Sequence, residues 1–548
     1  MILRPFLLLH VFVQSSMALN ILVFLLGTTQ TERANMEFLA QQLALRHHTV
    51  VTVKPILIPE EPRLVKPKLH LVREKTLKNL LPRKLFRPLE LAYNEGPWKA
   101  KYDYDGHLEP YYAAHNASCG RIINSDLIDG LQKDSIDVAI VYAGNPCQLA
   151  VCHVLGVPFI YYDNEGLTDE TLVSAAVPVD LDFPLSNCRS ARSSSQIFSR
   201  LSSAFCLLNE MISQSGIASF ASLVSKRYRL MDGPITRMFA EDYSLKKRFP
   251  SFPDVNTLKK DASLYFINSD PLLEFERSLP SNVVPIGGMH MEHAKPLFAP
   301  WNETIAKSKE GTIVVSFGTL VNSSAMSESQ ASAIYGALSQ LTEYRIIWNV
   351  GPSLSPPGID VHNTLPHINI TSFLPQNDIL ADKRTRLLIT NGGMNSLMEA
   401  IVHGVPVMGI PLYGDKLTQT NVLKTIRTLL DSAKYKTVAK DMAKEFKSRH
   451  GRGSVFDKAV HYIEHVGKHR GAAFFRTPTN PWRQVKQLPL EMVLILLLTL
   501  ATPLYISWLF VSKIAVLLLN IRPITHVNEP KNESKEVIKT AKNVKSKQ

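Results

Sequence analysis

The segment 387–416, "LLITNGGMNSLMEAIVHGVPVMGIPLYGDK", constrains the fold of this chain more than any other. Its first residues are apolar without polar alternation, as is typical of a strand buried on both faces of a parallel sheet. Asn391-Gly392-Gly393 interrupts this strand, 394–403 has the pattern of an amphipathic helix, and "GVPVMGIPL" is a second apolar strand. Bare glycine backbone before a helix lets an anion approach the free N–H groups of its first turn. The segment therefore predicts a strand, an anion-binding turn, a helix and a strand.

The same alternation of strands and helices occurs elsewhere in the chain. "NILVFLLGTTQTERANMEFLAQQLALRHHTVVTV" predicts a strand, a loop, a helix over 31–46 and a strand, and 136–162 repeats that order. The basic stretch 54–134 is expected to be irregular, and the section up to about Asp261 mostly helical. A second series starts near Leu264, with "LYFINSDP", "VVPIGGM", "TIVVSFGT" and "YRIIWNV" as strands. The 548 residues thus predict two α/β domains with parallel sheets, whose ligands bind at the carboxyl ends of the strands.

The two ends of the chain predict secretion and a membrane anchor. Residues 1–18 combine an arginine, a short apolar stretch and a small-x-small cleavage site, with Leu19 as the expected mature start. Residues 492–512 carry no charge and suffice to cross a hydrocarbon core of about 30 Å, the alternative being a buried core helix. Lys513 and the lysine-rich tail place the C-terminus in the cytosol by the positive-inside rule. We expect a single-pass type I membrane protein with a lumenal ectodomain.

Charge and cysteine content exclude some classes of function. The net charge of +13 is dispersed and accompanies no recognisable nucleic-acid module, so no nucleic-acid binding is expected. Five irregularly spaced cysteines form neither a disulfide framework nor a zinc pattern, so one or two disulfides at most are expected. In a lumenal domain the sequons are candidate glycosylation sites, namely Asn116, Asn302, Asn322 and Asn369.

Several segments of the chain have a distinctive sequence, namely "NSDP", "NVVPIGG", "VVSFGT", "SFLPQNDIL", "TNGGMNSLMEAIVHGVPVMGIPLYGDK" and "DKAVHYIEHVGKHRGAA". Together they resemble the membrane-bound UDP-glucuronosyltransferases of the UDP-glycosyltransferase family. The resemblance implies an α/β protein of the GT-B class, with two facing Rossmann-like domains and a C-terminal transmembrane helix. It also implies a UDP-sugar and a small lipophilic acceptor as substrates, and leaves open an oligomer with itself or with family members.

The implied organisation has seven parts. They are a signal peptide (1–18), an N-terminal acceptor-binding domain (19–270), an inter-domain linker (271–310), a C-terminal UDP-sugar-binding domain (311–450), a late helix packing back towards the N-terminal domain (451–490), a transmembrane helix (491–512) and a basic cytosolic tail (513–548).

The resemblance also implies roles for individual residues. Phe373 stands where the family stacks an aromatic ring on uracil, Gln376 addresses the base, and Glu399 accepts hydrogen bonds from the ribose hydroxyls. The remaining positions that surround the diphosphate and the sugar are Ser316, Gly318, Thr319, Asn391, Gly393, Asn395, Ser396, Asp415 and Lys416. No metal and no separate cofactor is expected, because a helix dipole and amide donors stabilise the leaving diphosphate, and the UDP-sugar is a co-substrate. Taken singly, Glu399 could be a solvated helix residue, Phe373 a core residue and Asn395 a helix cap.

The chain departs from the family where acid–base catalysis is expected. The position of the family's catalytic histidine corresponds to Glu32, or to Gln30 in a second alignment, and the position of its supporting acid to Tyr142. Glu32 can serve as a carboxylate base, although an ordinary glutamate pKa near 4.3 makes it a weak one at neutral pH. Alternatively, Glu32 only interacts favourably with a helix dipole in a first turn.

Further departures affect the sugar end of the site. Asn391 replaces a histidine and keeps a donor for phosphate. Lys416 replaces a glutamine, and it either pairs with a sugar carboxylate or, as we favour, neutralises Asp415. About twenty residues of a further strand and helix are missing after the signature, which predicts an open edge of the second sheet.

The expected function is inverting transfer of a sugar, with glucuronic acid favoured, from a UDP-sugar to an acceptor hydroxyl. Location in the endoplasmic reticulum membrane is expected from family likeness. The alternative is a catalytically impaired relative that binds nucleotide-sugar or partners with active family members.

Overall fold

A computed structural model describes residues 18–26, 30–58, 71–99, 104–181, 185, 196–318, 321, 323–351, 355–412, 417–450, 454–475 and 490–519. Only the backbone is described for 30–32, 94, 99, 104–107, 196, 197, 491, 492, 496 and 516–519. The chain divides into two compact units, Met1–Met492 and Val493–Gln548. The signal peptide expected at 1–18 and most of the tail expected at 513–548 lie outside the described residues.

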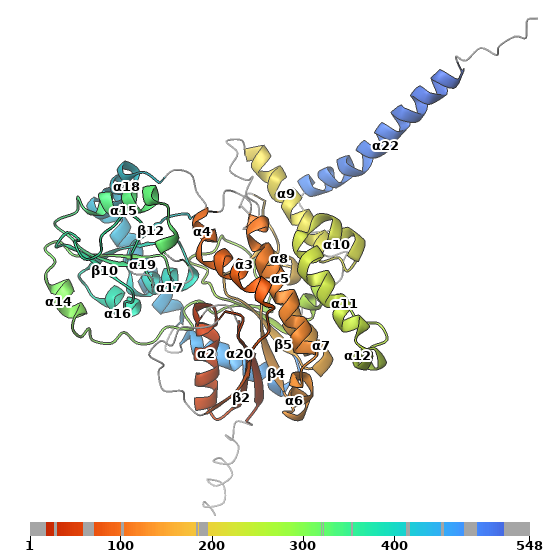
Figure 1. The fold of residues 1–548 in the computed structure, drawn as a ribbon, viewed down its shortest axis with the longest axis horizontal. Helices are drawn as coiled ribbons and strands as arrows, with labels where there is room; N and C mark the ends of the chain where they lie inside the picture. The colour runs from red at the N-terminus through yellow and green to blue at the C-terminus, as the bar shows by residue number, and fades with distance from the viewer. Residues whose placement is uncertain are drawn as a thin grey trace, which may run out of the picture. The chain divides into compact units, whose positions relative to one another are not determined.

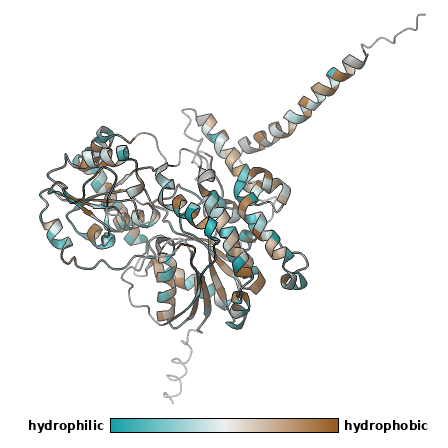
Figure 2. Cartoon of the chain, in the orientation of Figure 1, coloured by the Kyte–Doolittle hydropathy of each residue, from teal (hydrophilic) through white to brown (hydrophobic). Residues whose placement is uncertain are grey.

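Seven parallel strands form the first sheet, in the order β3-β2-β1-β4-β5-β6-β7. Figure 2 shows most of these strands as hydrophobic, which agrees with the burial of the central strands, whereas the edge strand β3 is partly exposed. The strand order changes direction between β1 and β4, which makes this pair a topological switch point. The strands are β1 (Asn20–Phe24), β2 (Thr49–Pro55), β3 (Val72–Leu77), β4 (Val138–Tyr142), β5 (Phe159–Asp163), β6 (Leu264–Ile267) and β7 (Val283–Pro285).

Five parallel strands form the second sheet, in the order β10-β9-β8-β11-β12. Its switch point lies between β8 and β11, where Val315 is in register with Ile389. The loops after these two strands therefore leave the sheet side by side, at the edge where ligands of such sheets bind. The strands are β8 (Thr312–Ser316), β9 (Arg345–Asn349), β10 (Ile368–Thr371), β11 (Thr385–Thr390) and β12 (Val407–Gly409).

Helices cover the sheets as shown in Figure 1. We call the part of the first unit around the first sheet the first lobe and the part around the second sheet the second lobe. In the first lobe the helices are α2 (Gln30–Leu45), α3 (Arg83–Asn94), α4 (Gly96–Lys99), α5 (Tyr104–Ile123), α6 (Leu127–Lys133), α7 (Pro146–Leu155), α8 (Asp169–Ser174), α9 (Gln196–Ser213), α10 (Ala218–Val224), η2 (Tyr228–Asp232), α11 (Gly233–Glu241), α12 (Tyr243–Arg248), α13 (Val255–Leu258) and η3 (Lys259–Asp261). The remaining elements of the first unit are α14 (Trp301–Ala306), η4 (Ser323–Ala325), α15 (Glu328–Leu338), α16 (Gln376–Ala381), α17 (Met394–His403), α18 (Gln419–Asp431), α19 (Ala433–His450) and α20 (Val455–Lys468).

The late helix α20 packs on the first sheet although it follows the second in sequence. Ile463 and Val466 are fully buried in one apolar cluster with residues of β1, β4 and α2. Phe38 on α2 and Phe456 on α20 make an edge-on ring contact at 5.9 Å, so both helices cover the same face. Helix α20, near the end of the first unit, thus packs against elements near its beginning.

The stretch 54–134 was expected to be irregular, but its described residues are largely helical. It contains β3 and helices α3 to α6. The sequence obscured them because α3 and α5 carry internal prolines, Pro88 and Pro110, which normally end helices. Long-range packing outweighs that preference, since Leu89 of α3 and Ala114 of α5 are fully buried in one small cluster.

The division between the two sheets also differs from the expectation. The second series was expected to start near Leu264, but β6 pairs with β5 of the first sheet and β7 pairs with β6. Strand β7 lies inside the segment 271–310 that was expected to be a linker. Apolar runs predict strands but carry no information on which sheet they join.

The second sheet ends at β12 within the described residues. No strand follows this three-residue strand in the parts of 410–475 that the structure describes. Instead the chain continues to α18, where the side chain of Gln419 donates a hydrogen bond to the carbonyl of Gly336 on α15 at 3.0 Å. This arrangement agrees with the missing strand and helix inferred from sequence.

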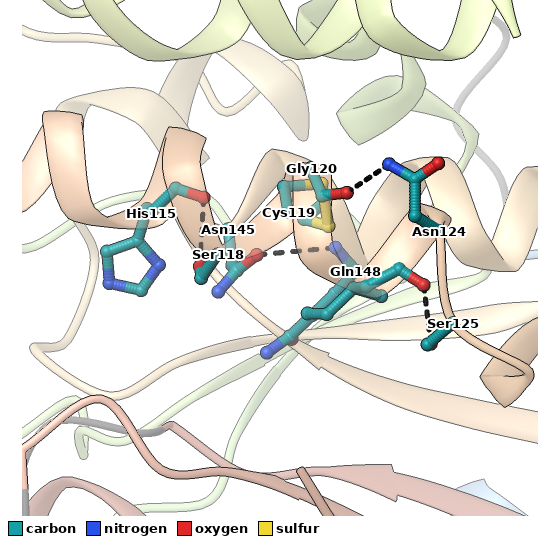
Figure 3. The surroundings of a disulfide bond; sticks show 10 residues. His115, Ser118, Cys119, Gly120, Asn124, Ser125, Asn145 and Gln148 are labelled. Atoms are coloured by element: carbon teal, nitrogen blue, oxygen red, sulfur yellow. Dashed lines mark hydrogen bonds between the residues drawn. A yellow bond between two sulfur atoms is a disulfide. The ribbon is translucent and has the colours of Figure 1, made fainter. Parts of the chain in front are cut away.

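A disulfide joins α5 to the first turn of α7 (Figure 3). Cys119 and Cys147 form this bond, and Cys206 is also disulfide-bonded. Cys152 is free and buried, and burial raises the pKa of its thiol. Asn145 caps α7 by accepting a hydrogen bond from the backbone N–H of Gln148, which fixes the helix start beside the disulfide.

The second unit contains the apolar helix α22 (Leu490–Leu519). Residues Val493–Ala515 form a 23-residue stretch with a mean hydropathy of 2.1. By length and composition it can cross a membrane, and it includes Pro503.

We expect Ile463→Ala to lower the free energy of unfolding by about 2–5 kcal/mol, because it leaves a cavity under α20. Denaturant unfolding of the full chain in detergent, followed by tryptophan fluorescence, measures this change. Val438→Ala on α19 is the control, since that side chain is 49% exposed and its loss should cost less than about 0.5 kcal/mol. Equal effects of the two substitutions would contradict the packing described for α20.

Candidate functional site

The glycine turn between β11 and α17 is open to an approaching ligand. Gly392 adopts a φ of 88°, which favours glycine, and both Gly392 and Gly393 are exposed. A Cβ atom on Gly392 would meet nothing within 4 Å. The N-cap residue Gly393 has no side chain that could cap the helix. The dipole and the first N–H groups of α17 can therefore attract an anion at this position.

The loop after β8 reaches the same edge of the sheet. Ser316 is the last residue of β8 and is 2% exposed, whereas Gly318 turns the chain with a φ of 75° and has open space at its Cβ position. Between them, Phe317 is buried and makes an edge-on contact with Trp98 of α4 at 5.4 Å. The first lobe therefore supplies an aromatic side chain that supports this loop. Ser316 and Gly318 were both expected near the diphosphate and the sugar. Gly318 borders open space, whereas Ser316 is buried.

Three polar side chains form one cluster: Gln376 and Glu399, expected at the nucleoside, and Ser396, expected at the diphosphate. Nε2 of Gln376, the first residue of α16, lies 3.0 Å from Oγ of Ser396 and 2.7 Å from Oε2 of Glu399. Ser396 and Glu399 are three residues apart on α17 and therefore share one face of the helix. The cluster lies on the helix whose start is the open turn.

Burial strongly affects the Glu399 carboxyl. It raises the pKa of Glu399 to about 7; the hydrogen bond from Gln376 opposes this shift and the charge of Asp378 adds to it. The Glu399 side chain is only 15% exposed and hydrogen-bonded, which is not the environment of a solvated helix residue. The carboxyl is thus only partly ionised at neutral pH.

Asn395 contacts the first lobe instead of open space. Its Nδ2 donates to Oδ1 of Asn35 on α2 at 3.0 Å, and Nδ2 of Asn35 donates back to Oδ1 of Asn395 at the same distance. Nδ2 of Asn268, directly after β6, also donates to Oδ1 of Asn395, at 2.9 Å. Asn35 lies within hydrogen-bonding distance of Tyr162 and Asn164 as well. Asn395 therefore joins the carboxyl edges of the two sheets. The sequence predicted a diphosphate contact or a helix cap at this position, and neither prediction included a contact with the first lobe.

Phe373 is placed for stacking and not for core packing. It follows β10 and is 67% exposed. Oγ1 of Thr371 accepts a hydrogen bond from its backbone N–H and donates one to its carbonyl, so the local turn is fixed. An exposed ring held by a rigid turn can bind the face of a base.

The residues expected to replace the catalytic pair occupy different environments. Glu32 lies in the first turn of α2, and its side chain is outside the described atoms. Tyr142 is 2% exposed and packs edge-on against Tyr162 at 5.5 Å within the apolar cluster of the first sheet. Tyr142 therefore has the environment of a core residue, and its catalytic role stays a prediction.

His115 on α5 has a buried environment that the sequence did not reveal. It is 5% exposed, and its Nε2 has no hydrogen-bond partner in the described part of the chain. Burial and, secondly, the charge of Arg227 lower the pKa of His115 to about 4. Figure 3 shows its ring near the disulfide at the start of α7. A single histidine within a helix gives no signal in a sequence, and so low a pKa makes it a poor base at neutral pH.

Several expected site residues cannot be placed. Thr319, Asp415 and Lys416 lie outside the described residues, whereas Asn391 follows β11 and is partly exposed. Within the described ranges, no three His, Cys, Asp or Glu side chains are grouped as metal ligands.

The sequons differ in accessibility. Asn116 lies inside α5, and Ser118, which completes its sequon, is 5% exposed and donates to the carbonyl of His115. A glycan acceptor needs an accessible segment, so this position is unfavourable. Asn302 is exposed on α14, Asn369 is partly exposed on the edge strand β10, and Asn322 is outside the described residues.

Comparison with known proteins places this geometry in a family. The profile of the family described as UDP-glucoronosyl and UDP-glucosyl transferase matches residues 20–521. UDP-glucuronosyltransferase 3A1 of Bos taurus is 30% identical over 415 residues, which cover 70% of this chain and 72% of the relative. UDP-glucuronosyltransferase 2B15 of Homo sapiens is 25% identical over 512 residues, which cover 86% and 89%.

A solved structure shows the same architecture. Phytolacca americana UGT2, complexed with UDP-2fluoro-glucose and pterostilbene, aligns with a TM-score of 0.52 at 14% identity, covering 82% of this chain and 100% of that one. Together with the two parallel sheets, this likeness identifies the GT-B fold that the sequence predicted. Because the profile spans both lobes, the chain belongs to the family of UDP-glucoronosyl and UDP-glucosyl transferases.

Proposed function

We propose that this protein transfers a sugar from a UDP-sugar to a hydroxyl group of a small lipophilic acceptor, with inversion at the anomeric carbon. The observation that carries the proposal is the position of two features on α17. Its open amino end can take a diphosphate, and one turn later Glu399 and Ser396 form a polar cluster with Gln376. A uridine diphosphate needs these two features at this separation.

Each part of the nucleotide has a matching group in the second lobe. Phe373 offers an exposed ring to the uracil, and Gln376 offers an amide to its edge. The Glu399 carboxylate accepts hydrogen bonds from ribose hydroxyls, because each oxygen has free acceptor sites. The diphosphate lies at the start of α17 by Gly392, where the helix dipole favours negative charge.

The reaction is a single in-line displacement. The acceptor oxygen forms a bond to the anomeric carbon while the bond from that carbon to the diphosphate oxygen breaks, so the diphosphate leaves with the electron pair. The N–H groups at the start of α17 stabilise the negative charge that develops there. Glu32, in the first turn of α2, takes the proton from the acceptor hydroxyl.

The favoured sugar is glucuronic acid, since the two relatives compared above are named as glucuronosyltransferases. The family description also includes glucosyl transfer, so glucose is the second candidate. Helix α22 anchors the chain in the endoplasmic reticulum membrane, with both lobes in the lumen.

A catalytically impaired nucleotide-sugar binder is the second candidate function. The observation that favours it is the core packing of Tyr142, which leaves Glu32 without the family's supporting acid. Such a protein keeps the second lobe's nucleotide site and lacks turnover.

We expect Glu399→Ala to weaken UDP binding at least about 10-fold, because hydrogen bonds to a charged group contribute about 1.5–3 kcal/mol each. Isothermal calorimetry with the full chain in detergent measures this change. Glu445→Ala is the matched control, since Glu445 is an exposed glutamate on α19 of the same lobe. Unchanged affinity in Glu399→Ala would remove the nucleotide assignment.

UDP affinity should fall as the pH decreases through about 7. The ionised form of Glu399 is the better acceptor for ribose hydroxyls, and its raised pKa of about 7 means that protonation removes this form below neutrality. The limiting slope is about 10-fold per pH unit for one proton. Glu399→Gln should show a flatter profile, and since both proteins bind the same ligand, the titration of UDP itself cancels in the comparison. Parallel profiles would exclude Glu399 as the titrating group.

Glu32→Ala separates the two candidate functions. If Glu32 is the general base, this substitution should reduce transfer to a panel of phenols by about 100-fold or more and leave UDP affinity unchanged. Gln41→Ala, an exposed position on the same helix, is the control. Turnover is measured with UDP-glucuronic acid and UDP-glucose. UDP binding without turnover in the unmodified protein would favour the impaired binder.

A further inference from the structure

The segment that leaves β7 brings a histidine to the nucleoside cluster. Gly288 adopts a φ of 84°, and a Cβ atom there would lie 3.3 Å from the ring of Phe446 and 3.5 Å from Met398 of α17. The positive φ favours glycine at this position, where the backbone passes α17 and α19. Two residues later, His290 lies with Nε2 4.0 Å from Oε1 of Glu399.

Two hydrogen bonds hold this segment against the start of α16. Nδ2 of Asn377 donates to the carbonyl of Glu292 at 3.1 Å, and the backbone N–H of Lys295 donates to Oδ1 of Asp378 at 2.9 Å. Asn377 and Asp378 directly follow Gln376, which binds Glu399. The position of His290 is therefore fixed by the same helix start that fixes the carboxyl.

The imidazole of His290 is buried with its hydrogen-bonding capacity unused. Its side chain is 13% exposed, and neither ring nitrogen has a hydrogen-bond partner among the residues that the structure describes. Burial lowers the pKa of His290 to about 4, so the ring is neutral at physiological pH and carries one N–H donor. An unsatisfied buried donor costs free energy, and such groups in native proteins call for a functional explanation.

The gap between His290 and Glu399 suits a shared hydroxyl group. At 4.0 Å the two atoms are too far apart for a direct hydrogen bond, but one oxygen can lie about 2.8 Å from both. A hydroxyl is both a donor and an acceptor. It can donate its hydrogen to the carboxylate and accept one from the imidazole, which satisfies both buried groups at once.

We propose that His290 is the second half of the ribose site: its Nε2–H donates to the oxygen of a ribose hydroxyl whose hydrogen is donated to Glu399. This inference rests on the proposed use of a uridine nucleotide. It assigns the Nε2–H tautomer, because that nitrogen faces the carboxylate. His290 then selects nucleotides with a ribose over those with a deoxyribose. It belongs to the segment that leaves the first sheet, whereas Glu399 belongs to the second lobe.

The test compares UDP with its 2′-deoxy, 3′-deoxy and 2′,3′-dideoxy analogues by calorimetry on the full chain. We expect the unmodified protein to bind UDP more tightly than at least one deoxy analogue. His290→Phe keeps a planar ring but lacks the donor, so it should weaken UDP binding about 2- to 10-fold and leave binding of the dideoxy analogue unchanged. His290→Gln, whose amide nitrogen can reach the position of Nε2, should restore the preference for ribose. His293→Phe, an exposed position three residues later, is the control and should change neither affinity.

The outcomes separate this inference from the proposed function. If the unmodified protein does not bind UDP, the nucleotide site itself is refuted and the inference with it. If UDP binds and His290→Phe weakens UDP and the dideoxy analogue equally, or changes neither, His290 has only a packing role and the inference is refuted while the function stands. Should His290→Phe fail to fold, His290→Ala provides the same comparison, because the readout is the difference between two ligands on one protein.

Discussion

The reciprocal amide pair between Asn35 and Asn395 is the contact on which the arrangement of this site depends. It joins the helix that follows β1 to the helix that follows β11, so the carboxyl edges of two parallel sheets meet at residues 360 positions apart. Both amides are satisfied by each other and by neighbouring residues, including Asn268. A buried network of this kind is stabilising only when every member has its partners. The start of α17 is therefore fixed relative to the first lobe, while the adjoining glycine turn remains open.

The two lobes differ in how far they keep the features of their family. In the second lobe, the open turn, the exposed ring of Phe373 and the polar cluster around Glu399 all fit a uridine nucleotide. In the first lobe, the position of the supporting acid is occupied by Tyr142 within the core. In the proposed mechanism, nucleotide binding and proton transfer depend on side chains of different lobes, so a change in one function need not alter the other.

Local features allowed the sequence to predict some elements to the residue. The helix expected at 394–403 is α17, because a glycine turn starts it and Gly404, with a φ of 68°, ends it. The helix expected at 31–46 is α2, shifted by one residue. Where long-range packing decides the structure, the sequence was insufficient. Helices α3 and α5 form in spite of internal prolines because they pack on each other, and the sheet to which β7 belongs depends on pairing with β6.

The same limit applies to the site. The family resemblance assigned Gln376, Ser396 and Glu399 to the UDP-sugar, and the structure brings these three side chains into one cluster. No local pattern could show that Asn395 is held by the first lobe or that His290 lies next to Glu399, since those partners are distant in sequence and meet only in the folded chain.

Helix α17 is held at both ends and in its middle. This rigidity explains how the buried carboxyl of Glu399, whose ionised form is disfavoured, can bind a nucleotide. Asn395 fixes its start, Gln376 contacts it one turn later, and His403 at its end lies 2.7 Å from Oδ1 of Asn377. Burial raises the pKa of Glu399, which means that the folded protein disfavours the ionised form. In the proposed nucleotide complex, ribose hydroxyls donate to that form and so offset part of its desolvation. Because the helix is already in place, the hydrogen bonds form without reorganisation of the lobe, and the same preorganisation keeps the amide donors at its start directed at the diphosphate as its charge develops.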